Sequence, residues 1–169
     1  MANDASIRIV RTVAIFVACL LCVSAAGSAT VADCIKAVFE YGANFDVTTL
    51  TPVIETRQWQ TDNRHVRNEF IQWKTIRAKD GWATMRECAS CSPRAGITEL
   101  FLSPDRRDLP CGLKSGMTTK TLIQRLGQPH ARRGFHLVYL YPPEERNQEI
   151  TLIVERDRLA GVMWRFYSD

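Results

Sequence analysis

The sequence predicts an α+β fold in which short helices pack on one face of a small antiparallel sheet, tied by disulfides and preceded by an N-terminal signal peptide. Three observations support this prediction. An apolar segment near the N-terminus follows two arginines, several short segments alternate apolar and polar residues as strands do, and four cysteines lie outside the apolar segment. The chain has 169 residues, 46% hydrophobic and 24% charged, which is typical of one globular domain.

The charge and the motif content narrow the range of functions. The formal net charge is only +4 and the basic residues are scattered, so no nucleic-acid partner is expected. The sequence has no serine-hydrolase, zinc-protease, P-loop or dinucleotide motif, and no motif surrounds its three histidines. Glu144 and Glu145 lie beside two prolines, which favours a solvated loop over a catalytic carboxylate pair. We therefore predict a protein without catalytic residues, cofactor or metal.

Residues 1–32 predict export through a bacterial, Sec-type signal peptide. Arg8 and Arg11 precede an apolar run, and small residues follow that run, in the order that defines such a signal. Cleavage is expected after Ala29 or Ala32, so that the mature chain begins near Asp33. The chain has no Asn-x-Ser/Thr sequon, which is compatible with a bacterial source.

Two kinds of membrane attachment are weaker interpretations of the same segment. Residues 13–23 are strongly apolar but amount to about half of the roughly 20 residues needed to cross a bilayer. Lipidation would need a leucine-like residue three positions before a cysteine, and Phe16 before Cys19 is a poor match. We therefore expect a periplasmic or secreted protein that associates with a membrane only through a partner.

Four cysteines remain in the expected mature chain, namely Cys34, Cys88, Cys91 and Cys111. An even number of cysteines in an exported protein predicts two disulfides, here with three possible pairings. We favour Cys34 with Cys88 and Cys91 with Cys111, because the second bond would join the two ends of a strand expected over residues 97–103.

The Cys88-Ala-Ser-Cys91 spacing also occurs in thioredoxin-like redox pairs and in half of a zinc site. A redox pair should open a helix after a buried strand, whereas Pro93 follows Cys91 closely. A zinc site needs a second closely spaced pair, and Cys34 and Cys111 are far apart in the sequence. Structural disulfides are the favoured interpretation, and a thiol-disulfide enzyme that uses Cys88 and Cys91 is the alternative.

Residues 33–103 are predicted to form an N-terminal helix and a β-hairpin region. Asp80-Gly81 between two β-rich runs is a strong hairpin signal, and Pro52 favours an edge position for the strand in which it lies. The expected elements are a helix over residues 33–41 that stops at Gly42 and strands over residues 48–59, 66–77, 82–88 and 97–103.

Residues 112–169 are predicted to form a helix and a three-stranded unit. Thr118 is the expected N-cap, Met117 and Leu122 form a hydrophobic staple, and Gly127 is the C-cap. The strands are expected over residues 136–141, 150–155 and 162–167. The sequence shows no clear internal repeat, so residues 33–169 are predicted to be one domain.

Short motifs between residues 116 and 164 resemble the SmpA/OmlA family. They are Gly116-Met117-Thr118, Leu122, Leu126-Gly127-Gln128-Pro129, Val138-Tyr139 and the segment 159–164. That family contains the small lipoprotein subunit of the bacterial outer-membrane β-barrel assembly machine. The pattern is also similar to one unit of the β-lactamase-inhibitor-protein fold. The resemblance implies helical elements that lean on a small antiparallel sheet.

Four residues near the first C-terminal strand are candidates for partner binding. Arg132, Arg133 and Phe135 lie in an expected turn after the helix, and Tyr139 lies in the strand that follows. Arginine and aromatic side chains are enriched at protein interfaces. We therefore predict a protein-binding surface at these residues.

These observations lead to one favoured hypothesis, a non-enzymatic, periplasmic or secreted protein-binding module. It would act as an envelope-assembly accessory or as an inhibitor or immunity protein, and its partner would be another envelope or exported protein. The sequence leaves the oligomeric state open. Core packing is expected for three of the four tryptophans, which are Trp59, Trp73, Trp82 and Trp164.

Overall fold

The structure is a computed structural model that describes residues 30–91, 95–105, 107–141 and 148–167. The expected signal peptide, apart from its last residues, lies outside these residues, as do Glu144 and Glu145. The elements expected from the sequence can therefore be compared with the structure from Val31 onward.

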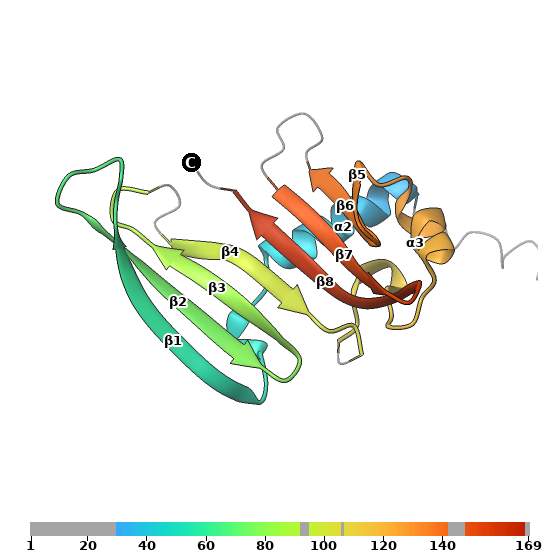
Figure 1. The fold of residues 1–169 in the computed structure, drawn as a ribbon, viewed down its shortest axis with the longest axis horizontal. Helices are drawn as coiled ribbons and strands as arrows, with labels where there is room; N and C mark the ends of the chain where they lie inside the picture. Colours follow the sequence, from blue (N-terminus) through green and yellow to red (C-terminus); the bar gives the residue numbers. More distant parts are fainter. Residues whose placement is uncertain (1–29, 92–94, 106, 142–147, 168–169) are drawn as a thin grey trace, which may run out of the picture. The chain divides into compact units, whose positions relative to one another are not determined.

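A single antiparallel sheet of eight strands dominates the described residues, in the order β1-β2-β3-β4-β8-β7-β6-β5 (Figure 1). An antiparallel sheet accompanied by short helices is therefore confirmed. The strands are β1 Val53–Asp62, β2 Phe70–Ala78, β3 Gly81–Glu87, β4 Ala95–Leu102, β5 Ala131–Arg133, β6 His136–Tyr141, β7 Gln148–Glu155 and β8 Arg158–Phe166. The helices are α2 Val31–Ala43 and α3 Thr119–Leu126, with short 3-10 helices η1 Val47–Thr49 and η2 Pro110–Gly112.

The strand order contains a repeat that the sequence did not reveal. Helical segments followed by four antiparallel strands occur twice, first as α2, η1 and β1 to β4 and then as η2, α3 and β5 to β8. We call these the N-terminal half and the C-terminal half. The last strands of the two halves, β4 and β8, pair antiparallel and join the halves into one sheet. In strand topology, the two halves are thus related by an approximate twofold rotation.

Local sequence signals are confirmed where a turn or a cap specifies them. β2 and β3 form the expected hairpin, with Ala78 opposite Gly81. The Oγ1 atom of Thr118 accepts a hydrogen bond from the backbone N–H of Thr121, and Gly127 ends α3 with a φ of 79°. Such capping removes unsatisfied backbone groups at both helix ends.

The turn expected at Arg132 and Arg133 is instead a strand. Arg132 pairs with Leu137 and Arg133 with His136, so that β5 is an edge strand of the sheet. The C-terminal half therefore has four strands and not three. A strand of three residues is too short to show an alternating pattern, which explains why the sequence did not predict it.

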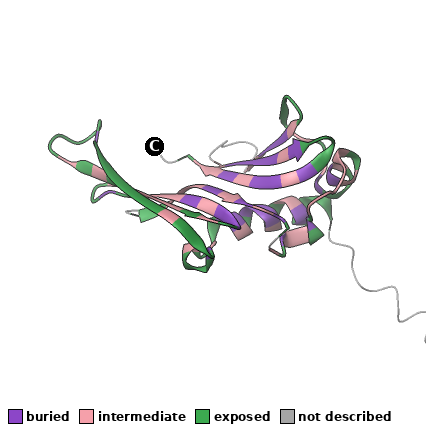
Figure 2. Ribbon diagram, turned by 60° about the horizontal axis from the view of Figure 1, so that its bottom comes forward, coloured by how far each residue is buried: buried purple, intermediate pink, exposed green. Residues whose placement is uncertain are grey.

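Both helices pack on the same face of the C-terminal half. The indole N–H of Trp164 in β8 donates a hydrogen bond to the carbonyl oxygen of Val38 in α2, at 2.9 Å. The hydroxyl of Tyr139 in β6 donates to the carbonyl oxygen of Gly127 after α3, at 3.1 Å. Helix α2 thus covers the C-terminal half although it belongs to the N-terminal half in the chain. Figure 2 shows the result. β1 is exposed along nearly its whole length, while β7 and β8 are largely buried.

Gly42 lies within α2, which ends at Ala43, two residues after the end of the expected helix. A Cβ atom on Gly42 would lie 2.3 Å from Cδ1 of Trp164. Glycine is required at this position because the indole ring lies directly against the helix backbone. The expectation that Gly42 only stops the helix is therefore wrong.

Two disulfides form, but not in the favoured pairing. Cys34 bonds to Cys111, and Cys88 bonds to Cys91. The favoured bonds are wrong because Cys111 lies in η2, where it bonds to Cys34 of α2, while Cys88 and Cys91 are close enough along the chain to bond to each other. The first bond ties α2 to η2, and the second closes a short loop after β3.

Candidate protein-binding surface

Aromatic and arginine side chains gather on the face of the sheet opposite the two helices, which we call the outer face. Strand register and alternation assign residues to this face. Trp59 lies opposite Trp73, and Trp73 lies opposite Arg86. Trp82 lies opposite Phe101 on the same side. These residues come from β1 to β4, the part of the sheet that lies farthest from α3 in Figure 1.

Two aromatic pairs form the apolar part of the outer face. The rings of Trp59 and Trp73 stack with centroids 6.1 Å apart and an interplanar angle of 9°. Trp59 is 39% exposed, and the indole N–H of Trp73 donates to Oγ1 of Thr61 at 2.9 Å. Trp82 and Phe101 form the second pair, with centroids 6.3 Å apart. The hydrogen bond to Thr61 fixes the orientation of an aromatic surface that solvent can reach.

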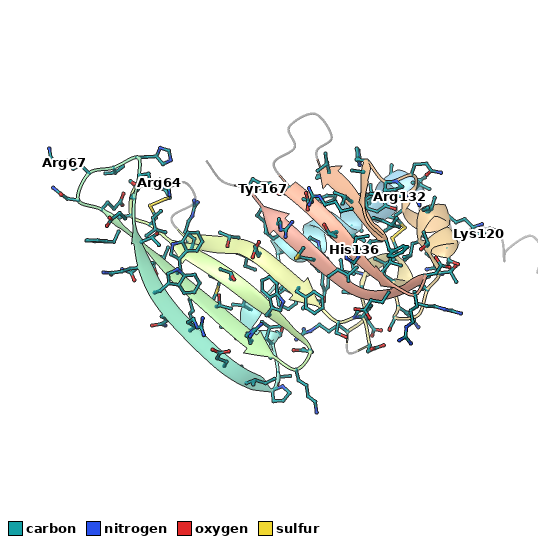
Figure 3. The ribbon with its side chains drawn as sticks, in the orientation of Figure 1. Arg64, Arg67, Lys120, Arg132, His136 and Tyr167 are labelled. Atoms are coloured by element: carbon teal, nitrogen blue, oxygen red, sulfur yellow. A yellow bond between two sulfur atoms is a disulfide. The ribbon has the colours of Figure 1, made fainter. Side chains whose placement is uncertain are left out.

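Two hollows lie beside these aromatic pairs, and Trp59, Thr84 and Glu99 contribute to both. The first, of about 350 Å³, extends toward the arginines of β1 and β2. The second, of about 430 Å³, extends toward Arg165 and Tyr167 at the end of β8. Figure 3 shows Tyr167 at this junction between the two halves. The outer face can therefore receive side chains of a partner beside its aromatic rings.

Arginines outnumber carboxylates on this part of the outer face. Glu55 is shared by Arg57 and Arg77, with N–O distances of 3.4 and 3.8 Å. Among the described residues, no ion pair forms at Arg86. The strand register places these charged side chains of β1 to β4 and β8 on the outer face: Arg57, Arg77, Arg86, Arg165, Glu55 and Glu99. The surface therefore has an excess of positive charge.

A buried carboxylate, that of Glu149, stabilises the outer face near the junction of the two halves. Glu149 in β7, 2% exposed, accepts hydrogen bonds from Arg133 at 2.8 and 2.9 Å, from Thr151 at 3.0 Å and from Arg165 at 3.2 Å. Burial acts to raise the pKa of Glu149, but the hydrogen bonds of Arg133 and Thr151 and the two arginine charges lower that pKa below its ordinary value of 4.5. Because Arg165 also pairs with Glu99 of β4, at 3.3 Å, this network spans both halves.

The structure separates the four residues that the sequence predicted as one binding surface. Tyr139 is buried on the helix-covered side, and this burial raises the pKa of Tyr139 to about 12. Arg133 is held by Glu149. Arg132 and Phe135 are exposed, Phe135 by 83%, and Arg132 lies at the far side of the sheet from the β1–β2 connection (Figure 3). The four side chains therefore do not form one continuous surface.

The expectation of three core tryptophans is also wrong. Only Trp164 is fully buried, whereas Trp73 and Trp82 are half-buried and Trp59 is exposed. Trp59, Trp73 and Trp82 lie on the outer face, which no helix among the described residues covers. A signal was present in β1, where polar residues surround Trp59 on both faces of the strand.

A carboxylate, that of Glu69, lies beside the Cys88–Cys91 disulfide. The Cys88 sulfur is 3.8 Å from Oε1 of Glu69 and 3.6 Å from Nδ2 of Asn63. Glu69 accepts hydrogen bonds from Asn63 at 2.6 Å and from the backbone N–H of Ser90 at 2.8 Å. These contacts attach the β1–β2 connection to the disulfide loop. A neighbouring carboxylate disfavours a thiolate at Cys88.

Comparison of the chain with known protein families, with curated proteins and with solved structures finds no match. Within the described ranges, no helix has the length and apolar character needed to cross a bilayer. The same residues contain no group of three or more His, Cys, Asp or Glu side chains that could hold a metal ion. The outer face is the site that the geometry supports best.

Proposed function

We propose that the chain is an exported, non-enzymatic protein-binding module whose outer face binds an acidic segment of another envelope or exported protein. The observation that carries this proposal is the exposed Trp59–Trp73 pair among arginines on a sheet face without helices. Tryptophan and arginine are the residues that most often dominate binding energy at protein interfaces. Because Trp73 is already held by Thr61, binding costs little side-chain entropy there.

Charge on the outer face supports an acidic partner. Arg86 has no carboxylate partner among the described residues, and Arg57 and Arg77 share the single carboxylate of Glu55. A guanidinium group forms strong bidentate hydrogen bonds with a carboxylate. Partner carboxylates placed near Arg86 and Arg77 would complete this pairing.

Exposed apolar side chains are concentrated in the same half of the sheet, and Trp59 is the member that the strand register places on the outer face. Large exposed apolar residues are common on β1, on its connection to β2 and at the start of β2, and scarce elsewhere in the described sheet. By the same register, Val53 and Phe70 lie on the other face, so they do not extend the apolar surface around Trp59. The residues in this region are Val53, Ile54, Trp59, Val66 and Phe70.

Two disulfides support a location in an oxidising compartment, either the periplasm or the exterior. The proposed role is that of an envelope-assembly accessory, an inhibitor or an immunity protein. Each of these roles needs a rigid surface rather than a reactive group. The Glu149 network and the Cys34–Cys111 disulfide supply that rigidity.

A thiol-disulfide enzyme is the second candidate function, favoured by one observation, the bond between Cys88 and Cys91. Glu69 beside Cys88 weighs against it, since catalytic cysteines are activated by cations or helix N-termini. Thiol titration separates the two functions. A structural disulfide should resist mild dithiol reductants, whereas a catalytic pair should be reduced readily.

Quantitative capture from the native envelope tests the proposed function. The tagged chain is compared with a Trp59→Ala, Trp73→Ala double variant and with Phe135→Ala, a matched control that removes an exposed aromatic ring away from the outer face. A partner should be enriched by the original chain and by Phe135→Ala and lost by the double variant. Equal enrichment by all three, with unchanged melting temperatures, would contradict the proposal.

A further inference from the structure

Strand β1 has a long free edge in the described sheet. It pairs only with β2, and the pairing is regular from Glu55 to Asp62 after a register shift between Val53 and Glu55. The other edge strand, β5, has only three residues. The outward N–H and C=O groups of a regular edge strand form a ready template for pairing with another strand.

Between Glu55 and Asp62, this strand lacks two common protections of an exposed edge, proline and lysine. Proteins block such edges with proline, lysine, a bulge or a covering segment. Pro52 and the register shift come before Glu55, and between Glu55 and Asp62 the strand has no proline and no lysine. Among the described strands, only β2 pairs with β1, so segment 55–62 offers its other edge to a further strand.

We propose that two copies of the chain pair antiparallel through their β1 edges, so that one sheet runs through both copies. In an antiparallel pair, the side chains of directly opposite residues lie on the same face of the sheet. If the outer faces of both copies lie on the same side, the twofold axis therefore passes through a residue and not between two residues. A pair centred on Gln58 uses the regular segment 55–61 of both strands. A pair centred on Arg57 would place like charges directly opposite, which is destabilising. A pair centred on Thr56 would extend into the register shift.

The Gln58-centred pairing brings complementary side chains together. Arg57 of each copy lies opposite Trp59 of the other, so that two cation–π contacts can form on the outer face. Glu55 lies opposite Thr61 of the second copy, and Gln58 lies opposite itself. The exposure of Trp59 in the single chain, 39%, leaves its ring accessible for this contact. The dimer would place two outer faces side by side, where they could bind a partner with two equivalent sites.

Sedimentation equilibrium on the purified chain, over a dilution series, tests this proposal. The original chain should have twice the mass of one chain at high concentration. Gln58→Lys and Gln58→Glu should each be monomeric, because two like charges would lie opposite each other at the twofold axis. An equimolar mixture of the two variants should restore the dimer, since lysine would then lie opposite glutamate.

Gln60→Lys is the matched control, because it adds the same charge to the same side of the same strand. Gln60 would lie opposite Thr56 of the second copy, so this variant should remain dimeric. Thermal melts check that all variants fold. A monomeric original chain, or a dimer that Gln58→Lys does not weaken, would overturn the proposal. Capture of an envelope partner by monomeric Gln58→Lys would still report separately on the outer face.

Discussion

Arg132 and Arg133 are neighbours in β5 but have different surroundings. Arg133 donates two hydrogen bonds to the buried carboxylate of Glu149, whereas Arg132 is exposed. We expect Arg133→Ala to lower the free energy of unfolding by about 1–2 kcal/mol, because Glu149 would lose two donors but keep Arg165 and Thr151. Arg132→Ala should change it by less than about 0.5 kcal/mol. Urea denaturation measures both values, and equal effects would show that the ion pair is not stabilising.

Glu149 should also make stability depend on pH. Its pKa is lower in the folded chain than its ordinary value of 4.5, so its contribution is present above that pH and is lost as pH falls through the folded pKa. We expect the original chain to melt at a higher temperature than Glu149→Gln near neutral pH. The difference should shrink below about pH 4.5. A difference that stays constant on acidification would contradict the assigned direction of the shift.

The end of α3 allows a test at the scale of a single element. Gly127 has a φ of 79°, and a Cβ atom there would lie 2.9 Å from Cγ1 of Val31. We expect Gly127→Val to lower the free energy of unfolding by at least about 1–2 kcal/mol, since β-branched residues resist the left-handed region. Gln128→Ala, at the exposed neighbouring position, is the control. Equal melting temperatures would mean that α3 does not require glycine at its end.

Elements with strong local signals could be predicted from the sequence. The β2–β3 hairpin occurs where Asp80-Gly81 predicts a turn, although its two loop residues are Lys79 and Asp80 and Gly81 begins β3. Thr118 and Gly127 specify the two ends of α3. β5 could not be predicted, because its three residues are too few to show an alternation of apolar and polar side chains. Gly42 was misinterpreted because its function depends on Trp164, more than a hundred residues away in the sequence.

At the scale of the whole molecule, the two disulfides should contribute unequally to stability. Cys34–Cys111 has a sequence separation of 77 residues, and Cys88–Cys91 has a separation of 3. Loop-closure entropy gives about 4.5 kcal/mol for the first and about 2 kcal/mol for the second. We expect replacement of the first pair by serine to lower the urea midpoint by more than replacement of the second pair. The reverse order would show that contacts around Glu69, rather than chain entropy, dominate.

The candidate site could not be predicted from local sequence, because it depends on how the halves are arranged. Trp59 and Trp73 look like core residues in the sequence, but both lie on the outer face, opposite the side on which α2 packs against Trp164. Tyr139 looked accessible beside Arg132, but it faces the carbonyl oxygen of Gly127. Long-range packing thus decided which aromatic residues remain exposed.

Site-specific photocrosslinking in the native envelope tests the proposed outer-face interaction most directly. A photoreactive residue is placed at Thr84, which borders both hollows of the outer face, and, in separate chains, at Phe135 and at Lys120 on α3, both of which are exposed. We expect a crosslinked partner from Thr84 and none from Phe135 or Lys120. Crosslinks from Lys120 or Phe135, with none from Thr84, would contradict an interaction through the outer face.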